Sequence, residues 1–111
     1  MTRKIIKSVC VFCGSRDGAN DKYRTVAIQL GQTIAKKKLT LVYGGGNIGL
    51  MGHLASAAQS NDCKILGVIP KHLMEKEVGK INLKNLIVTR NMHERKKIMY
   101  SESDAFIVLP G

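Results

Sequence analysis

Apolar runs rich in β-branched residues alternate with helix-forming segments along the whole chain, and this alternation constrains the fold more than any other feature. At this spacing it is typical of βαβ units with right-handed crossovers and a parallel sheet. With 111 residues the chain is long enough for one domain and too short for two. We therefore expect a single α/β domain over residues 1–111, with a loop and one helical turn at 70–84. Strands are predicted at 5–13, 39–43, 65–69, 86–89 and 105–109.

Helices are predicted between these strands. The first begins at a cap formed by Asn20 or Asp21 and ends near the lysines at 36–38, where cations complement the helix dipole. A helix of small residues is expected at 48–59, and a third helix at 92–101. In the first helix the apolar positions recur on one face, which predicts its buried side: Tyr23, Val26, Ala27, Leu30 and Ile34.

The last predicted strand, residues 105–109, consists of five consecutive apolar residues. A continuous run of this kind is typical of a strand covered on both faces, as in a parallel sheet. In open α/β sheets, ligands bind just beyond the carboxyl ends of the strands. The chain therefore ends where a binding loop is expected to begin.

Composition indicates an ordinary globular domain. The chain is 44% hydrophobic and 23% charged, and no stretch approaches the ~18 consecutive apolar residues that a transmembrane helix needs. The N-terminal segment has basic residues but no apolar run of signal-peptide length. A cytoplasmic location with no membrane association is expected.

The cysteines do not indicate a metal or disulfide site. There are three of them, an odd number, which argues against a disulfide framework. Cys10 and Cys13 have the C-x-x-C spacing, but they fall on a predicted strand, where residues three apart point to opposite faces. Because no second Cys/His pair completes a zinc site, buried structural cysteines are favoured and no metal is expected.

The charge balance is less ordinary. The chain carries 18 Lys+Arg against 8 Asp+Glu, a formal net charge of +10. So basic a chain suggests nucleic acid, but the cations are scattered along the sequence and no DNA- or RNA-binding motif accompanies them. No nucleic-acid partner is expected, and phosphorylated small molecules account for part of the positive charge in this interpretation.

The densest motif is LVYGGGNIGLMG at 41–52, where a strand ends, three glycines turn and a helix begins. Gly44, Gly46 and Gly49 match the G-x-G-x-x-G pattern of dinucleotide sites. Backbone N–H groups can approach an anion closely here, and the helix N-terminus adds positive partial charge. No Asp or Glu ends the next strand, so NAD is not expected. Contact with a phosphate or nucleotide is favoured over the alternative of a tight turn that serves packing alone.

Ser15 follows the first predicted strand, next to Gly14. It would open onto the same edge of the sheet as the three glycines. Its hydroxyl could contact a substrate, or it could simply be a turn residue.

The segment at 92–101 gathers apolar and basic residues on one face of a helix. Met92, Arg95, Lys96 and Met99 occupy positions i, i+3, i+4 and i+7. The apolar members turn this face toward the interior, where isolated charges are costly. Either the long side chains of Arg95 and Lys96 extend back to water, or they bind an anion at the edge of the sheet. We favour the anion, because a guanidinium makes forked contacts with phosphate or carboxylate.

These segments together resemble the Lonely Guy family, whose members are cytokinin riboside 5′-monophosphate phosphoribohydrolases. The resemblance implies a Rossmann-like nucleotide-binding domain, usually in a homodimer, and no metal or organic cofactor. It also implies hydrolysis of the N-glycosidic bond of AMP or an N6-substituted AMP to the free base and ribose 5-phosphate. The similarity follows the chain in order through VFCGSRDG (11–18), LVYGGGNIGLMG (41–52), GVIPKHLMEKE (67–77), NMHERKK (91–97) and SDAFIVLPG (103–111).

The resemblance assigns roles to single residues. Arg95 matches the catalytic arginine of the family, and Lys96 matches its substrate-contacting neighbour. Glu77 matches an acid among the substrate contacts of the family, although the polar loop around it indicates no function by itself. The full set of expected substrate-binding residues is Ser15, Gly44, Gly45, Gly46, Glu77, Met92, Lys96 and Gly111.

The residues at 109–111 match the start of the family motif PGGxGTxxE, whose glycines and threonine hold the phosphate and whose glutamate is catalytic. The sequence ends at the first glycine of that motif, Gly111. We therefore expect an N-terminal portion of such an enzyme, a Rossmann-like domain truncated after about the fifth strand, that is weakly active or inactive alone. Three alternatives remain: a non-catalytic nucleotide- or phosphate-binding module, a degraded gene fragment that does not fold stably and, least favoured, nucleic-acid binding.

Overall fold

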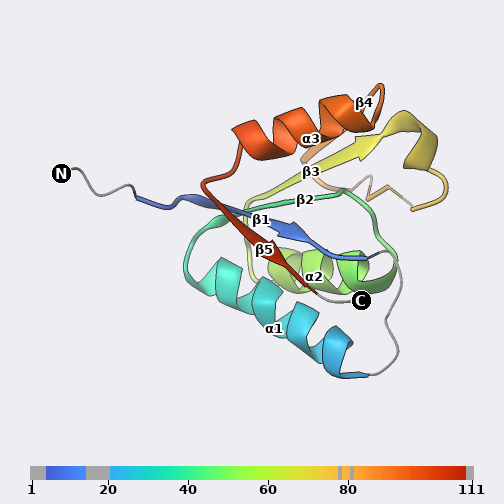
Figure 1. The fold of residues 1–111 in the computed structure, drawn as a ribbon. Coiled ribbons are helices and arrows are strands. Elements are labelled where there is room, and N and C mark those ends of the chain that lie inside the picture. Colours follow the sequence, from blue (N-terminus) through green and yellow to red (C-terminus); the bar gives the residue numbers. More distant parts are fainter. Residues whose placement is uncertain (1–4, 15–20, 78, 81, 110–111) are drawn as a thin grey trace.

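The computed structural model describes residues 5–14, 21–77, 79–80 and 82–109. It contains a five-stranded parallel sheet with helices on both faces (Figure 1). The predicted α/β class is confirmed, and each predicted strand and helix is present with bounds that differ only at the ends. In chain order the elements are β1 (Ser8–Phe12), α1 (Asp21–Lys36), β2 (Thr40–Tyr43), α2 (Gly49–Ser60), β3 (Ile65–Pro70), the 3₁₀ turn η1 (Lys71–Leu73), β4 (Asn85–Thr89), α3 (Met92–Ser101) and β5 (Ala105–Val108).

The strand order is β4-β3-β2-β1-β5, and all neighbouring strands are parallel. From β1 to β4 each new strand is added on the same side, and the chain then returns across the sheet to place β5 beside β1. Because crossovers keep one hand, this reversal puts α1 and α2 on one face and α3 on the other (Figure 1). Ligands bind at the carboxyl ends of the strands near such a reversal.

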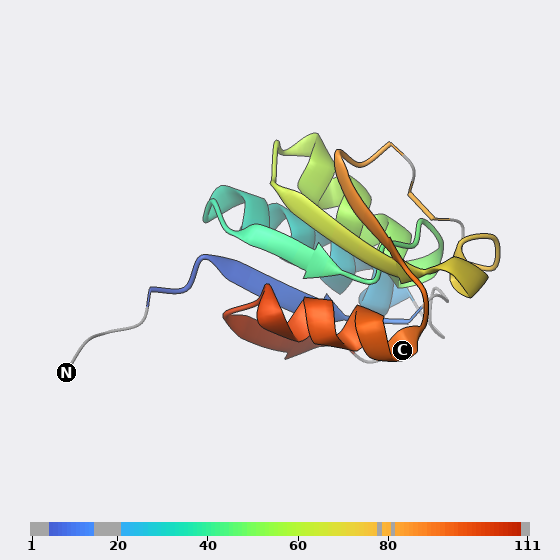
Figure 2. The ribbon, with the colours of Figure 1, turned by 90° about the horizontal axis from the view of Figure 1, so that it is seen from above.

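Each face of the sheet has its own hydrophobic core. The larger one lies under α1 and α2, whose close approach depends on Gly31: a Cβ there would lie 2.5 Å from the carbonyl oxygen of Leu54. The smaller one lies under α3 and includes Val68 and Met99. Figure 2 shows α3 lying along the sheet on the side away from α1 and α2.

The two cysteines of the C-x-x-C pair point to opposite faces, as predicted. Cys10 is buried in the core under α3, whereas Cys13 packs against the core under α1 and α2. Both thiols are free, as is that of Cys63. Among the described residues no group of His, Cys, Asp or Glu is arranged to hold a metal ion.

The prediction that the fifth strand is covered on both faces is wrong. Phe106 is 45% exposed and Val108 is 74% exposed. The reason is the position of β5: among the described residues it pairs with β1 alone, at one side of the sheet, and α3 packs chiefly on β3 and β4. The Phe106 ring instead joins an aromatic cluster with Phe12 and Tyr100, whose ring centroids lie 5.2–6.3 Å apart.

Val26 is also misplaced by the helical pattern, since it is 45% exposed. The buried positions of α1 are Ala27, Gly31 and Ile34, the side that packs against α2 and the sheet. The pattern treats every apolar residue on one side of the helix as buried, whereas the small side chains mark the true contact line. Across the described ranges no helix is both long and apolar enough to cross a membrane.

Candidate functional site

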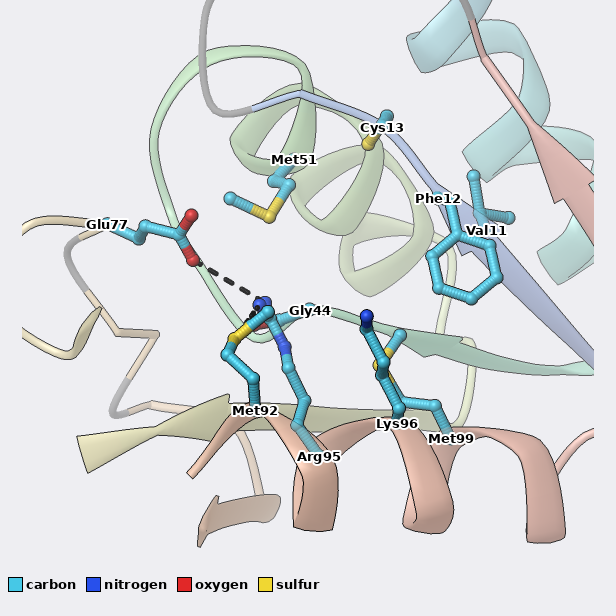
Figure 3. A pocket seen from close by; sticks show the side chains of 10 residues that line it. All are labelled: Val11, Phe12, Cys13, Gly44, Met51, Glu77, Met92, Arg95, Lys96 and Met99. Carbon is cyan, nitrogen blue, oxygen red and sulfur yellow. Dashed lines mark hydrogen bonds and ion pairs between the residues drawn. The ribbon is translucent and has the colours of Figure 1, made fainter. Parts of the chain in front are cut away.

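A pocket of about 170 Å³ lies at the carboxyl ends of β1 and β2, between α3 and the loop that carries Glu77 (Figure 3). The end of β1 and the residue after it form one wall, and Met51 of α2 forms another. The four residues predicted to share the inner face of α3 all line it: Met92, Arg95, Lys96 and Met99. The predicted orientation of this helix is therefore confirmed.

Arg95 is the most firmly anchored side chain of the pocket. Its Nε donates to the carbonyl oxygen of Val68 at 2.9 Å, and its Nη2 donates to the carbonyl oxygen of Gly44 at 2.7 Å. Nη2 also lies 3.4 Å from Oε1 of Glu77. Burial lowers the pKa of Arg95, and the negative charge of Glu77 opposes that change. An arginine keeps its charge at neutral pH under these conditions.

Glu77 reaches the pocket from a loop whose backbone is fixed on two sides. Its N–H donates to the carbonyl oxygen of Leu73 at 2.8 Å, and its carbonyl oxygen accepts from the N–H of Asn47 at 3.0 Å. The first bond ties the loop to η1, and the second ties it to the turn after β2. The carboxylate, with a side chain 17% exposed, is thereby held toward Arg95 (Figure 3).

The three glycines at 44–46, here called the glycine turn, have all their carbonyl oxygens engaged within the protein. The first accepts from Arg95, the second from the backbone N–H of Lys80 at 2.9 Å, and the third from the hydroxyl of Tyr43 at 2.9 Å. Burial raises the pKa of that Tyr43 hydroxyl, so it stays a donor. The turn is thus a rigid part of the pocket.

The orientation of the glycine turn decides which backbone groups face Arg95. At Gly44 the turn directs a carbonyl oxygen at the guanidinium, and in a planar trans peptide the N–H of Gly45 points the opposite way. On the side that faces Arg95, the start of α2 therefore offers backbone N–H groups to an anion, whereas the N–H of Gly45 does not. That helix begins at Gly49, and its N-cap residue Ile48 offers no side-chain hydrogen bond to the first N–H groups.

Close packing limits the space at several of the glycines, most severely where a Cβ would meet backbone or the anchored Arg95 side chain. A Cβ on Gly44 would collide with Nη2 of Arg95, and a Cβ on Gly46 would lie 2.6 Å from the terminal methyl of Met51. Gly52 is more strictly constrained than Gly46, since its Cβ would lie 2.5 Å from the backbone carbonyl oxygen of Asn47, whereas the Met51 methyl can move. The packing interpretation of the motif is therefore supported at Gly44 and Gly52, and contact with a phosphate or nucleotide stays a prediction.

Sequence comparison places this geometry in a family. A family model described as "possible lysine decarboxylase" matches residues 51–111, more than half of the chain. Cytokinin riboside 5′-monophosphate phosphoribohydrolase LOG7 of Arabidopsis thaliana is 43% identical over 110 residues, which are 99% of this chain and 51% of that protein. The chain belongs to the Lonely Guy family. The probable phosphoribohydrolase LOGL1 of Oryza sativa subsp. japonica is 46% identical over 103 residues, 93% of this chain and 46% of the relative.

The Lonely Guy chain thus spans about half the length of the curated relatives it matches. Among solved structures, the molybdenum cofactor binding protein of Rippkaea orientalis superposes with a TM-score of 0.75 at 27% identity, covering 96% of this chain and 64% of that one. The Moco carrier protein of Chlamydomonas reinhardtii, 20% identical with a TM-score of 0.73, shows the same fold over 93% of this chain and 62% of that one.

The residues expected for a Lonely Guy site are brought together only in part. The pocket joins Gly44, Glu77 and three residues of α3: Met92, Arg95 and Lys96. Gly45 and Gly46 belong to the glycine turn behind it. Ser15 and Gly111 lie outside the described residues.

Other residues of the site gave no signal in the sequence. Lys80 is only 6% exposed, and its Nζ donates to Oδ1 of Asn47 at 3.1 Å, which closes the loop over the glycine turn. A lysine in a polar loop is normally solvated, so nothing in its neighbourhood predicts this contact. The Val68 carbonyl oxygen was equally unpredictable, because every strand residue carries one.

Proposed function

We propose that the pocket binds a nucleoside 5′-monophosphate, AMP or an N6-substituted AMP, and serves the hydrolysis of its N-glycosidic bond. The products are the free base and ribose 5-phosphate. One observation carries this proposal: Arg95, Glu77 and Gly44 converge at the carboxyl edge of the sheet in a chain 43% identical to a phosphoribohydrolase.

Glycoside cleavage passes through an oxocarbenium-like state, which a carboxylate stabilises or quenches by activating water. Glu77 is a weak candidate for the general base because its carboxylate already faces the Arg95 guanidinium. In the proposal Arg95 is the catalytic residue on this side of the glycosidic bond, and Glu77 contacts the substrate. The general base is the glutamate of PGGxGTxxE in the complete family member.

The remaining walls suit the other parts of a nucleotide. The Lys96 ammonium projects into the pocket (Figure 3) and, with the start of α2, offers positive charge to the 5′-phosphate. Met92 and Met51 offer apolar surface to the adenine ring of the substrate. The volume of about 170 Å³ is below the roughly 300–1,000 Å³ of typical ligand pockets, so these walls enclose part of a nucleotide.

The test separates binding from cleavage. The 111-residue chain is titrated with AMP by calorimetry, and adenine release is followed by chromatography beside the Arabidopsis relative. We expect AMP binding with release slower by ~10²–10⁴, because the motif glutamate is absent from these 111 residues. Adenine release as fast as that of the relative would contradict the assignment of the motif glutamate as the general base.

A fusion tests Arg95 directly. The second half of the Arabidopsis relative is joined after Gly111, and we expect this fusion to release adenine. Arg95→Ala in the fusion should abolish release, whereas Lys97→Ala on the exposed side of α3 should leave it intact. A folded Arg95→Ala fusion with unchanged turnover would overturn the proposal.

A second candidate, a non-catalytic binding module, is favoured by one observation. The molybdenum cofactor binding protein at 27% identity shares this fold with a TM-score of 0.75. Tight AMP binding by the fusion without any release of adenine would support this candidate.

A homodimeric assembly and a cytoplasmic location complete the phosphoribohydrolase proposal. Light scattering of the fusion after size exclusion tests the homodimer.

A further inference from the structure

A lysine stands at the start of each of four neighbouring strands. Lys7, Lys64 and Lys84 directly precede β1, β3 and β4, and Lys38 lies two residues before β2. Because the four strands are parallel, their starts share one edge of the sheet, and in strand order β4-β3-β2-β1 these residues form a row. Adjacent strands lie about 4.8 Å apart, so the row spans roughly 15 Å. We call it the lysine row.

All four side chains are exposed, and they line two adjoining hollows. Lys7, Lys38 and Lys64 line a hollow of about 510 Å³, and Lys64 and Lys84 line one of about 340 Å³. Both hollows share Cys63 and Lys64, so the positive charges follow a continuous depression. Successive members of the row are 20 to 31 residues apart in the sequence and look scattered there, yet they are neighbours in the fold.

Three carboxylates lie near the four lysines of the row: those of Asp62, Asp104 and the exposed Glu102, whose carbonyl oxygen accepts from the Ser8 hydroxyl. Asp62 lines both hollows. Asp104, which precedes β5, accepts hydrogen bonds from the backbone N–H groups of Lys7 and Ser8. Within the described ranges the four ammonium groups of the row make no ion pair with a carboxylate. The row therefore carries a net positive charge on the amino edge of the sheet.

We propose that the lysine row binds the sugar-phosphate backbone of a single-stranded nucleic acid. A hollow with regularly placed cations suits a polymer with regularly placed phosphates, as in grooves that follow a single strand. A single phosphate would need converging cations, and a flat membrane surface would not enter the hollows. None of the residues lining them is aromatic, so base stacking is absent and binding is independent of sequence.

The row lies at the opposite edge of the sheet from the pocket with Arg95. Strands of four to six residues separate the two edges, a distance of roughly 13–20 Å. Nucleic acid at the row and AMP at the pocket can therefore be bound together. This independence separates the two proposals experimentally, since either can fail while the other stands.

The test is fluorescence anisotropy of a labelled oligouridylate titrated with the 111-residue chain. Affinity should fall as KCl rises from about 50 to 200 mM, and four phosphate contacts predict a slope of log K against log salt near −2.8. The variant K38Q/K64Q/K84Q should lose about 2 from that slope. The control K71Q/K76Q/K97Q carries the same net charge on exposed lysines elsewhere and should keep the slope.

Three results would overturn the proposal. Equal loss of binding in both triple variants would show that net charge alone is responsible. Displacement of the oligonucleotide by excess AMP would place it in the pocket instead. Binding of the chain to phosphatidylserine vesicles, lost in K38Q/K64Q/K84Q, without any oligonucleotide binding would make the partner a membrane. Ultraviolet crosslinking of the unaltered chain, expected in peptides around 36–40 and 62–66, gives an answer that needs no variant.

Discussion

The Nη2 atom of Arg95 donates a hydrogen bond to the carbonyl oxygen of Gly44 at 2.7 Å, across 51 residues of sequence. This contact joins α3 to the end of β2, and the Nε bond to Val68 joins the same side chain to β3. The helix is therefore tied to the sheet by the residue proposed to act on the substrate. Substitutions at Arg95 or Gly44 should therefore change stability as well as the proposed activity.

Gly44→Ala should destabilise the protein because its Cβ would occupy the place of the Arg95 guanidinium. We expect a loss of about 1–3 kcal/mol in the free energy of unfolding, measured by urea titration. In an Arg95→Ala background the loss caused by Gly44→Ala should be smaller by about 1 kcal/mol or more, because the clashing guanidinium is gone. Gly31→Ala, which meets the Leu54 carbonyl oxygen instead, should cost the same in both backgrounds.

Glu77→Gln should destabilise more than Glu75→Gln, although both remove one negative charge. Glu77 faces a guanidinium whose side chain is 11% exposed, whereas Glu75 is exposed in the same loop. Loss of the charge leaves Arg95 buried with two carbonyl oxygens, so we expect a difference of about 1–3 kcal/mol in urea unfolding. Identical unfolding curves for the two variants would show that the pair contributes nothing.

Asn91→Ala should loosen the start of α3. The Asn91 side chain accepts from the N–H of Glu94 at 2.8 Å and caps the helix that carries Arg95. Loss of such a cap costs about 1 kcal/mol, while Asn91→Ser should keep most of the stability. Thermal unfolding followed by circular dichroism compares the two variants, and equal melting temperatures for Ala and Ser would argue against the cap.

Stability should fall as pH rises above 9. Burial raises the pKa of the Cys10 thiol to about 11 and that of Cys13 to about 12, from 9.0 in the unfolded chain. Above pH 9 the unfolded state loses these protons first, so the free energy of unfolding decreases by up to about 1.4 kcal/mol per pH unit for each thiol. Below pH 9 this contribution is fully present.

The double variant Cys10→Ala/Cys13→Ala tests that pH dependence. Urea unfolding under reducing conditions at pH 8, 9 and 10 should show a shallower decline for the variant than for the unaltered chain, whatever its absolute stability. Parallel declines would mean that the two thiols do not titrate on unfolding.

Much of the fold was predictable from local patterns. The run at 65–69 and the periodic segment at 92–101 became β3 and α3 because strand and helix formation depends on residues a few positions apart. The inner face of α3 was equally predictable, since it follows from helical spacing. The exposure of Val108 was not, because it depends on which strand lies at the edge of the sheet.

The amino-acid order alone determined which segments are strands, which are helices, and which face of α3 would turn toward the sheet. Only the tertiary structure decided that a Gly44 carbonyl rather than an N–H faces Arg95, that Lys80 is buried over the glycine turn, and that distant lysines form one row. Local patterns record the preferences of neighbouring residues, whereas these contacts depend on strand order and on the path of the backbone between strands. Such long-range geometry exists only once the chain is packed.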